Sequence, residues 1–100
     1  MQLLVRPEAH AELLEAQAWY ELHSTGLGFE FARAVDAAVA RVLRMPLAFP
    51  RIEADFRHVI TRKFPYSVIY HASESEVLVV ALFHHRRKPG SWQRNIGGGG

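Results

Sequence analysis

Two stretches in the first half of the chain repeat their apolar residues at helical spacing. In the first stretch the intervals are four, three and four, through Ala9, Leu13, Ala16 and Tyr20. Pro7 suits the first turn of such a helix, because its missing N–H would be unpaired there anyway. The pattern predicts a helix from residue 7 to about residue 22. Three carboxylates are expected on a different, solvated face: Glu8, Glu12 and Glu15.

A second helix is predicted after the short break at Gly26-Leu27-Gly28. Its apolar face is formed by Phe31, Val35, Ala38 and Val42. Met45-Pro46 ends it, because a proline disfavours helical geometry at the residue before it. Two helices joined by so short a loop are expected to form an antiparallel hairpin with facing apolar stripes.

The second half of the chain is typical of strands. Residues 2–6 form a short strand, residues 46–56 are irregular, and three strand-like segments follow at 57–64, 66–72 and 77–84. The last segment is apolar almost without a break, which is typical of a strand buried on both faces. The prediction is an α+β domain of order βααβββ over residues 1–96, with the helical hairpin packed on a small, mostly antiparallel sheet. The four glycines at 97–100 suggest a flexible end or an appended segment.

The composition excludes several classes of protein. Residues are 49% apolar and 22% charged, as in an ordinary globular domain, and no cysteine is present for disulfides or thiolate sites. The start of the chain is too quickly charged for a signal peptide, and no apolar run approaches membrane-spanning length. We therefore expect a cytoplasmic protein without membrane contact. The scattered histidines match no metal-ligand spacing, so neither a metal nor another cofactor is expected.

Charge is distributed unevenly between the two halves. Residues 1–50 carry four basic and six acidic side chains, a balance of −2, whereas residues 51–100 carry eight and four, a balance of +4. A basic tail with one large aromatic residue, Trp92, follows the last strand. A basic half indicates an anionic partner, either nucleic acid or an acidic protein segment.

Several segments, in this order along residues 2–94, resemble the RelE/ParE toxin superfamily, and its ParE or plasmid-stabilisation branch more than its RelE branch. The segments are residues 15–21 with the pair Trp19-Tyr20, the loop Gly26-Leu27-Gly28, Met45-Pro46 with Phe49-Pro50, the strand pair 57–70, and an ending that carries His84, Arg87, Pro89 and Trp92. Each motif alone is weak, and the ordered set is what makes the resemblance specific.

The resemblance implies the toxin of a type II toxin–antitoxin pair, neutralised by a cognate antitoxin. The antitoxin binds the operator DNA, so this chain is expected to meet that DNA only indirectly, through the antitoxin. ParE-type toxins are associated with inhibition of DNA gyrase, whereas RelE-type toxins cleave mRNA on the ribosome, so the chain is an enzyme only in the second case. Likeness of fold does not choose between the two. A third alternative is a degenerate toxin that acts only as an antitoxin-binding corepressor.

The preferred interpretation, gyrase inhibition through a protein interface, requires no catalytic side chain. The residues expected to bind gyrase or the antitoxin are Arg57, Arg62, Arg86, Arg87 and Trp92. Under the ribonuclease alternative, the candidates for proton transfer and phosphate binding are His84, His85, Arg86 and Arg87. His84 and His85 are expected on opposite faces of a strand, where they cannot easily serve one site.

The aromatic residues raise a question of packing. Trp92 either folds back over the sheet or anchors an interface. Trp19 and Tyr20 are expected in the core, because the apolar stripe of the first helix passes through Tyr20.

Overall fold

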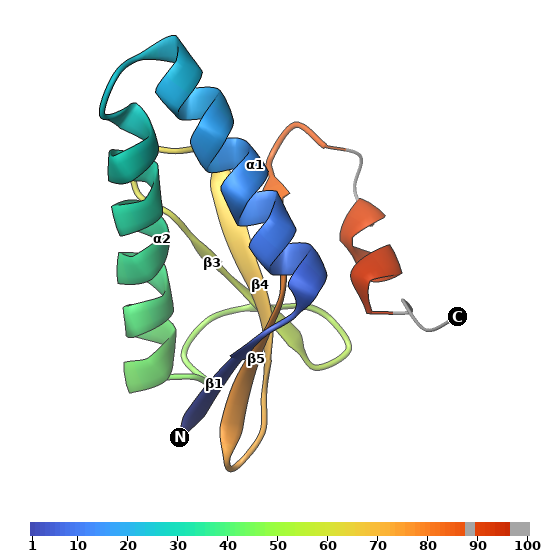
Figure 1. Ribbon diagram of the computed structural model, residues 1–100. Helices are drawn as coiled ribbons and strands as arrows, with labels where there is room; N and C mark the ends of the chain where they lie inside the picture. The colour runs from blue at the N-terminus through green and yellow to red at the C-terminus, as the bar shows by residue number, and fades with distance from the viewer. Residues whose placement is uncertain (88–89, 97–100) are drawn as a thin grey trace.

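The two predicted helices are α1 (Pro7–His23) and α2 (Leu27–Arg44), and they lie side by side as an antiparallel pair (Figure 1). The link between them is held by Glu21, whose carboxylate accepts hydrogen bonds from the backbone N–H groups of Gly26 (2.9 Å) and Gly28 (3.0 Å). This supplies acceptors for amides that the start of a helix leaves unpaired. Gly26 has a φ of 90°, and a Cβ atom at Gly28 would lie 2.6 Å from the Gln17 carbonyl oxygen. Glycine is therefore required at both positions.

The sheet contains five strands in the order β1-β5-β4-β3-β2. The strands are β1 (Gln2–Val5), β2 (Arg51–Glu53), β3 (Phe56–Ile60), β4 (Tyr66–Ala72) and β5 (Glu76–His84). Only β1 and β5 are parallel; the other neighbours are antiparallel. The prediction of an α+β fold of order βααβββ with a mostly antiparallel sheet is confirmed.

Two details of the prediction were wrong. The segment 46–56, expected to be irregular, contains β2, which is only three residues long and pairs with β3. The strand expected over residues 57–64 ends at Ile60, because the chain then turns at Lys63 with a φ of 71°. The basic tail, for which no secondary structure was predicted, contains the 3-10 helix η1 (Ser91–Asn95).

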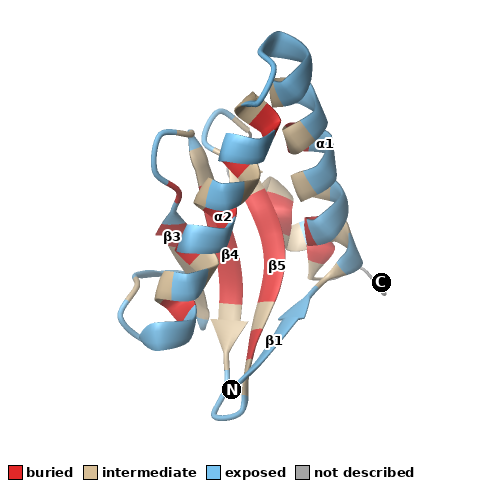
Figure 2. Ribbon diagram, turned by 60° about the vertical axis from the view of Figure 1, so that its left-hand side comes forward, coloured by how far each residue is buried: buried red, intermediate tan, exposed pale blue. Residues whose placement is uncertain are grey.

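Both faces of the sheet are covered, at least in part. The larger core lies between the helices and the sheet and is built on Phe31, Val59, Val68, Tyr70 and Val77 among others. A smaller core on the other face joins Ile69, Val80, Ala81 and Trp92. Buried residues accordingly run along β4 and β5, whereas β1 is exposed (Figure 2). The prediction that the last strand is buried on both faces is confirmed.

The structure, a computed structural model, describes residues 1–87 and 90–96. Pro89 of the expected ending and the glycine run 97–100 lie outside the described residues. Within the described part of the chain, no helix combines the length and the apolar character needed to cross a membrane.

Candidate functional site

A groove lies between α1 and the end of β5, with a volume of about 780 Å³. We call it the α1–β5 groove. Its lining comes from α1, β4, β5 and the tail, and consists of Glu12, Glu15, Ala16, Ala18, Trp19, Leu22, Tyr66, Leu82, His84, Arg87 and Arg94. The groove therefore joins the end of the last strand to the tail. Several of the residues that were expected to bind a partner come from this region.

Glu12 holds the base of the groove together. Its carboxylate accepts hydrogen bonds from the backbone N–H of Leu82 (3.1 Å) and from Nδ2 of Asn95 (3.2 Å), and it pairs with the guanidinium of Arg87 (3.4 Å). The expectation that Glu12 lies on a solvated face was wrong, because its side chain is only 20% exposed. The cause is the length of β1, which pairs with β5 only as far as Val79 and leaves the next part of that strand edge without a neighbouring strand. The Glu12 carboxylate therefore accepts the hydrogen bond of the Leu82 backbone N–H, for which a longer β1 would have provided a carbonyl oxygen.

Trp19 lies at the rim of the groove and not in the core. The expectation was wrong for Trp19, which is 54% exposed, and right for Tyr20, whose ring packs against Phe31 at 5.0 Å. Adjacent helical residues differ by about 100° around the axis, so the stripe that buries Tyr20 turns Trp19 outward. The Trp19 ring stacks on His23 at 3.7 Å, one turn further along α1. With Leu22, which is 87% exposed, it forms an apolar rim of the kind that marks protein interfaces.

His84 and Tyr66 meet inside the groove. Their rings touch edge to face with centroids 4.9 Å apart, and Nδ1 of His84 accepts a hydrogen bond from the Arg86 backbone N–H at 2.9 Å. Burial lowers the pKa of His84, and the positive charges of Arg86 and its neighbours lower it further. Burial also raises the pKa of Tyr66. Both side chains are therefore neutral near pH 7, His84 with its proton on Nε2.

His85 lies on the opposite face of the sheet from His84. Its Nε2 is 3.0 Å from Oγ of Ser67, and the same hydroxyl is 3.4 Å from Nδ1 of His58. These side chains line a separate groove of about 350 Å³ that Trp92 borders. Burial lowers the pKa of His58, with a smaller contribution from the charge of His85. The expected separation of His84 and His85 is thus present, and the two imidazoles cannot act as acid and base on one substrate.

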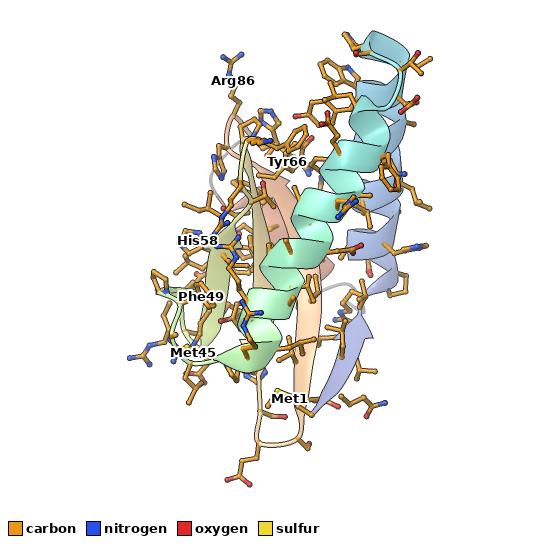
Figure 3. All side chains as sticks on the ribbon, turned by 90° about the vertical axis from the view of Figure 1, so that its left-hand side faces the viewer. Met1, Met45, Phe49, His58, Tyr66 and Arg86 are labelled. Carbon is orange, nitrogen blue, oxygen red and sulfur yellow. The ribbon has the colours of Figure 1, made fainter. Side chains whose placement is uncertain are left out.

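The other expected binding residues are dispersed. Arg87 lines the α1–β5 groove, and Arg86 projects into solvent at the same end of the sheet (Figure 3). Arg57 instead donates from Nη1 to the carbonyl oxygen of Phe49 at 2.7 Å, which ties down the chain between α2 and β2. Arg62 lies on the turn between β3 and β4, beside a different groove.

Trp92 is buried. Only 6% of it is exposed, and its ring packs against Phe56 with centroids 5.6 Å apart. Of its two expected roles, covering the sheet is the one that this conformation fulfils. Next to it in η1, the Gln93 amide donates to the carboxylate of Glu53 in β2, which fastens the tail to the far edge of the sheet. Contact between Trp92 and a partner would require η1 to leave the sheet.

Glu12, Tyr66 and Arg94 were not predicted from the sequence to be part of this site. The position of Glu12 carried one signal, because it lies three residues after Ala9 and four before Ala16, at the border of the buried stripe. Nothing in the sequence indicated that Arg94 lies across the groove from α1, because that depends on how the tail folds back.

The chemistry of the groove is that of a binding surface. It offers an apolar floor and rim, the guanidinium groups of Arg87 and Arg94, and a neutral imidazole. His84 could accept a proton, but its neighbour Tyr66 is a poor proton donor, because burial raises the pKa of its hydroxyl above that of a free tyrosine. In residues 1–87 and 90–96, no three histidine or carboxylate side chains lie close enough together to hold a metal ion.

Comparison with known proteins agrees with this fold. The family described as the ParE toxin of the type II toxin–antitoxin system, parDE, matches residues 3–89. Two relatives named Toxin ParE2, from two strains of Mycobacterium tuberculosis, are each 30% identical over 64 residues, which are 64% of this chain and 61% of each relative. The match thus spans less than two thirds of these relatives. A structure titled "Chromosomal ParDE TA system from P. aeruginosa" superposes with a TM-score of 0.61 and 17% identity, over 84% of this chain and 95% of that one. Since the family match extends over most of the chain, this protein belongs to the ParE toxin family of type II toxin–antitoxin systems.

Proposed function

We propose that this chain inhibits DNA gyrase by binding it through the α1–β5 groove and its apolar rim, and that a cognate antitoxin neutralises it. The observation that carries the proposal is the exposure of Trp19 and Leu22 beside two arginines at the groove, in a member of the ParE family. Tryptophan and arginine are the residues that most often dominate protein interfaces. An exposed apolar patch that is rimmed by polar side chains is the kind of surface that marks protein interaction sites.

The arrangement of the histidines supports an interface over a catalytic site. Cleavage of RNA needs a base for the 2′-hydroxyl and an acid for the leaving oxygen within reach of one phosphate. His84 lines the groove while His85 faces the other side of the sheet beside Ser67. Binding that stalls an enzyme on its DNA makes no such demand on the geometry.

The same groove suits an antitoxin segment that is both acidic and amphipathic. Apolar side chains of such a segment would cover Trp19 and Leu22, and its carboxylates would pair with Arg94 on the tail side. Arg87 is already paired with Glu12 and would be shared between the two carboxylates. Neutralisation then follows directly, because gyrase and the antitoxin compete for one surface.

The first test is incorporation of labelled thymidine and methionine, measured within minutes of controlled induction of the chain in bacteria. We expect thymidine incorporation to fall first. Trp19→Ala should abolish the effect, whereas His85→Ala, which lies outside the groove, should leave it unchanged. A prompt fall in methionine incorporation would instead indicate a ribosome-dependent ribonuclease. Continued growth, together with tight antitoxin binding, would indicate a corepressor without toxicity.

A further inference from the structure

A second basic surface lies on the edge of the molecule where α2 runs beside β3 and the turn to β4. Three arginines recur on the outer side of α2 at helical spacing: Arg33, Arg41 and Arg44. The turn between β3 and β4 adds Arg62 and Lys63, which line a groove of about 660 Å³ together with Arg33. We call these five residues the α2 edge. Figure 3 views the molecule from this side, with α2 in front and the sheet beside it.

The charge on the α2 edge is largely uncompensated among the described side chains. Arg33, Arg44, Arg62 and Lys63 are exposed, and Glu30 is the one carboxylate that lines the groove. Arg41 donates from Nη2 to the carbonyl oxygen of Ile60 at 3.0 Å, which fixes its guanidinium beside β3 without neutralising it. The α2 edge thus keeps an excess of positive charge.

The turn that presents two of these cations is rigid and strained. Thr61 is buried, with 4% exposed, and its single hydroxyl proton is shared between the carbonyl oxygens of Phe64 (2.9 Å) and Tyr66 (3.1 Å). Lys63 adopts a φ of 71°, a conformation that costs a residue with a side chain about 1 kcal/mol and that glycine or asparagine adopts more easily. Strain of this kind is concentrated at functional sites.

The geometry of the α2 edge matches an extended polyanion. Residues 33 and 44 are eleven positions apart, so the arginines on α2 span about 16 Å along the helix. In duplex DNA the phosphates of one strand recur about every 3.4 Å along the axis, so several lie within that span. Between the arginines the same side of α2 carries Ala34 and Ala37, whose small side chains line the groove and let a rigid backbone approach closely.

From these observations we propose that the α2 edge binds the phosphodiester backbone of nucleic acid directly, without base-specific contacts. The proposal is independent of gyrase inhibition, because it concerns a different surface and needs no second protein. It also departs from the expectation that this chain meets DNA only through its antitoxin. A phosphate-binding surface would let the toxin contact the DNA on which its target acts.

The test is binding of the purified chain to a short labelled DNA duplex, followed by fluorescence anisotropy as the salt concentration is raised. We expect log K to fall linearly with log salt, with a slope of about −3 to −5 for up to five phosphate contacts. Arg33→Gln and Arg62→Gln should each lower the affinity several-fold and reduce the slope by about 1. Lys63→Gly should do the same while leaving the thermal midpoint at or above that of the parent, which separates a loss of contact from a loss of fold.

A matched control variant makes the same change in net charge at a position outside the α2 edge. Ser75→Glu lies in the exposed turn between β4 and β5 and alters the net charge by −1, as Arg62→Gln does. If Ser75→Glu weakens binding as much as Arg62→Gln, the attraction reflects net charge alone and the proposal fails. It also fails if no salt-dependent binding is seen, or if polyglutamate displaces the DNA at equal charge, since the surface would then suit an acidic protein. Equivalent RNA and single-stranded DNA probes identify which nucleic acid binds best.

Discussion

Removal of the Glu12 carboxylate should destabilise the fold far more than its place on the surface of a helix suggests. Glu12 joins three parts of the molecule that are distant in sequence: α1, the edge of β5 through Leu82, and the tail through Asn95 and Arg87. In Glu12→Ala all three partners lose their acceptor at once. Glu12→Gln keeps an acceptor oxygen but removes the charge.

The size of the effect follows from the three contacts. The Leu82 amide would lose a charged acceptor, worth about 1.5–3 kcal/mol, and Asn95 would lose one hydrogen bond, worth about 1 kcal/mol. Asn95 keeps its second bond, to the Val80 carbonyl oxygen at 3.1 Å. The ion pair adds less than about 1 kcal/mol, because the Arg87 side chain is 35% exposed. We expect a loss of about 2.5–5 kcal/mol for Glu12→Ala and about 1–2 kcal/mol for Glu12→Gln. The first value is a large part of the total free energy of unfolding of a small domain.

Urea denaturation followed by circular dichroism measures this loss, with Glu15→Ala as the control. Glu15 lies one turn along the same helix and is exposed, so its removal should change the free energy of unfolding by less than about 0.5 kcal/mol. Hydrogen exchange gives a local check, since the Leu82 amide should lose protection first. If the two alanine variants unfold at the same urea concentration, Glu12 is not the link between helix, strand and tail, and the reasoning is wrong.

Three further predictions test the packing and the histidines. Trp92→Ala should cost about 3–5 kcal/mol in chemical denaturation, because it empties the smaller core, whereas Trp19→Ala should cost less than about 0.5 kcal/mol. Tyr70→Phe should lower the free energy of unfolding by about 1–3 kcal/mol, because the buried hydroxyl donates to the Pro46 carbonyl oxygen at 2.7 Å. The pKa of His58 is lowered in the folded state, so below its ordinary value of 6.5 the unfolded chain takes up the proton more readily. Thermal stability should therefore fall as the pH drops from about 7.5 to 5.5, and less steeply in His58→Gln.

The helices could be predicted because their buried stripes repeat locally. The stripe of α2 recurs at Phe31, Val35, Ala38 and Val42, and each of these is buried as expected. The strands were harder to predict than the helices, because a strand is defined by its hydrogen bonds to neighbouring strands that can be distant in the sequence. β2 has three exposed residues and no apolar pattern, and only its pairing with β3 reveals it.

The candidate site was predicted only in part, because it depends on contacts between residues far apart in the chain. Nothing in the sequence distinguishes the role of Arg57 from that of Arg87. In the structure Arg57 binds the Phe49 carbonyl oxygen of a loop, whereas Arg87 lines the α1–β5 groove. Trp19 was wrongly expected in the core, and the choice between the two roles of Trp92 was left open, because the exposure of each ring depends on what covers it. The tail folds back over Ile69, whereas none of the residues in 1–87 and 90–96 covers Trp19 near the end of α1 in the same way.

We propose that this toxin acts on gyrase through a non-catalytic surface. The most direct test is to measure gyrase-catalysed supercoiling of relaxed plasmid in the presence of the purified chain. We expect that the parent chain inhibits supercoiling, that Trp19→Ala removes the inhibition without unfolding the chain, and that His85→Ala inhibits as the parent does. Because His84 lines the groove, His84→Ala should weaken inhibition by less than about tenfold, and not by the orders of magnitude expected on loss of an acid–base catalyst. Two results together would contradict gyrase inhibition through a non-catalytic surface. Supercoiling would remain complete at saturating toxin, and the chain would cleave mRNA on added ribosomes in a reaction that His84→Ala abolishes.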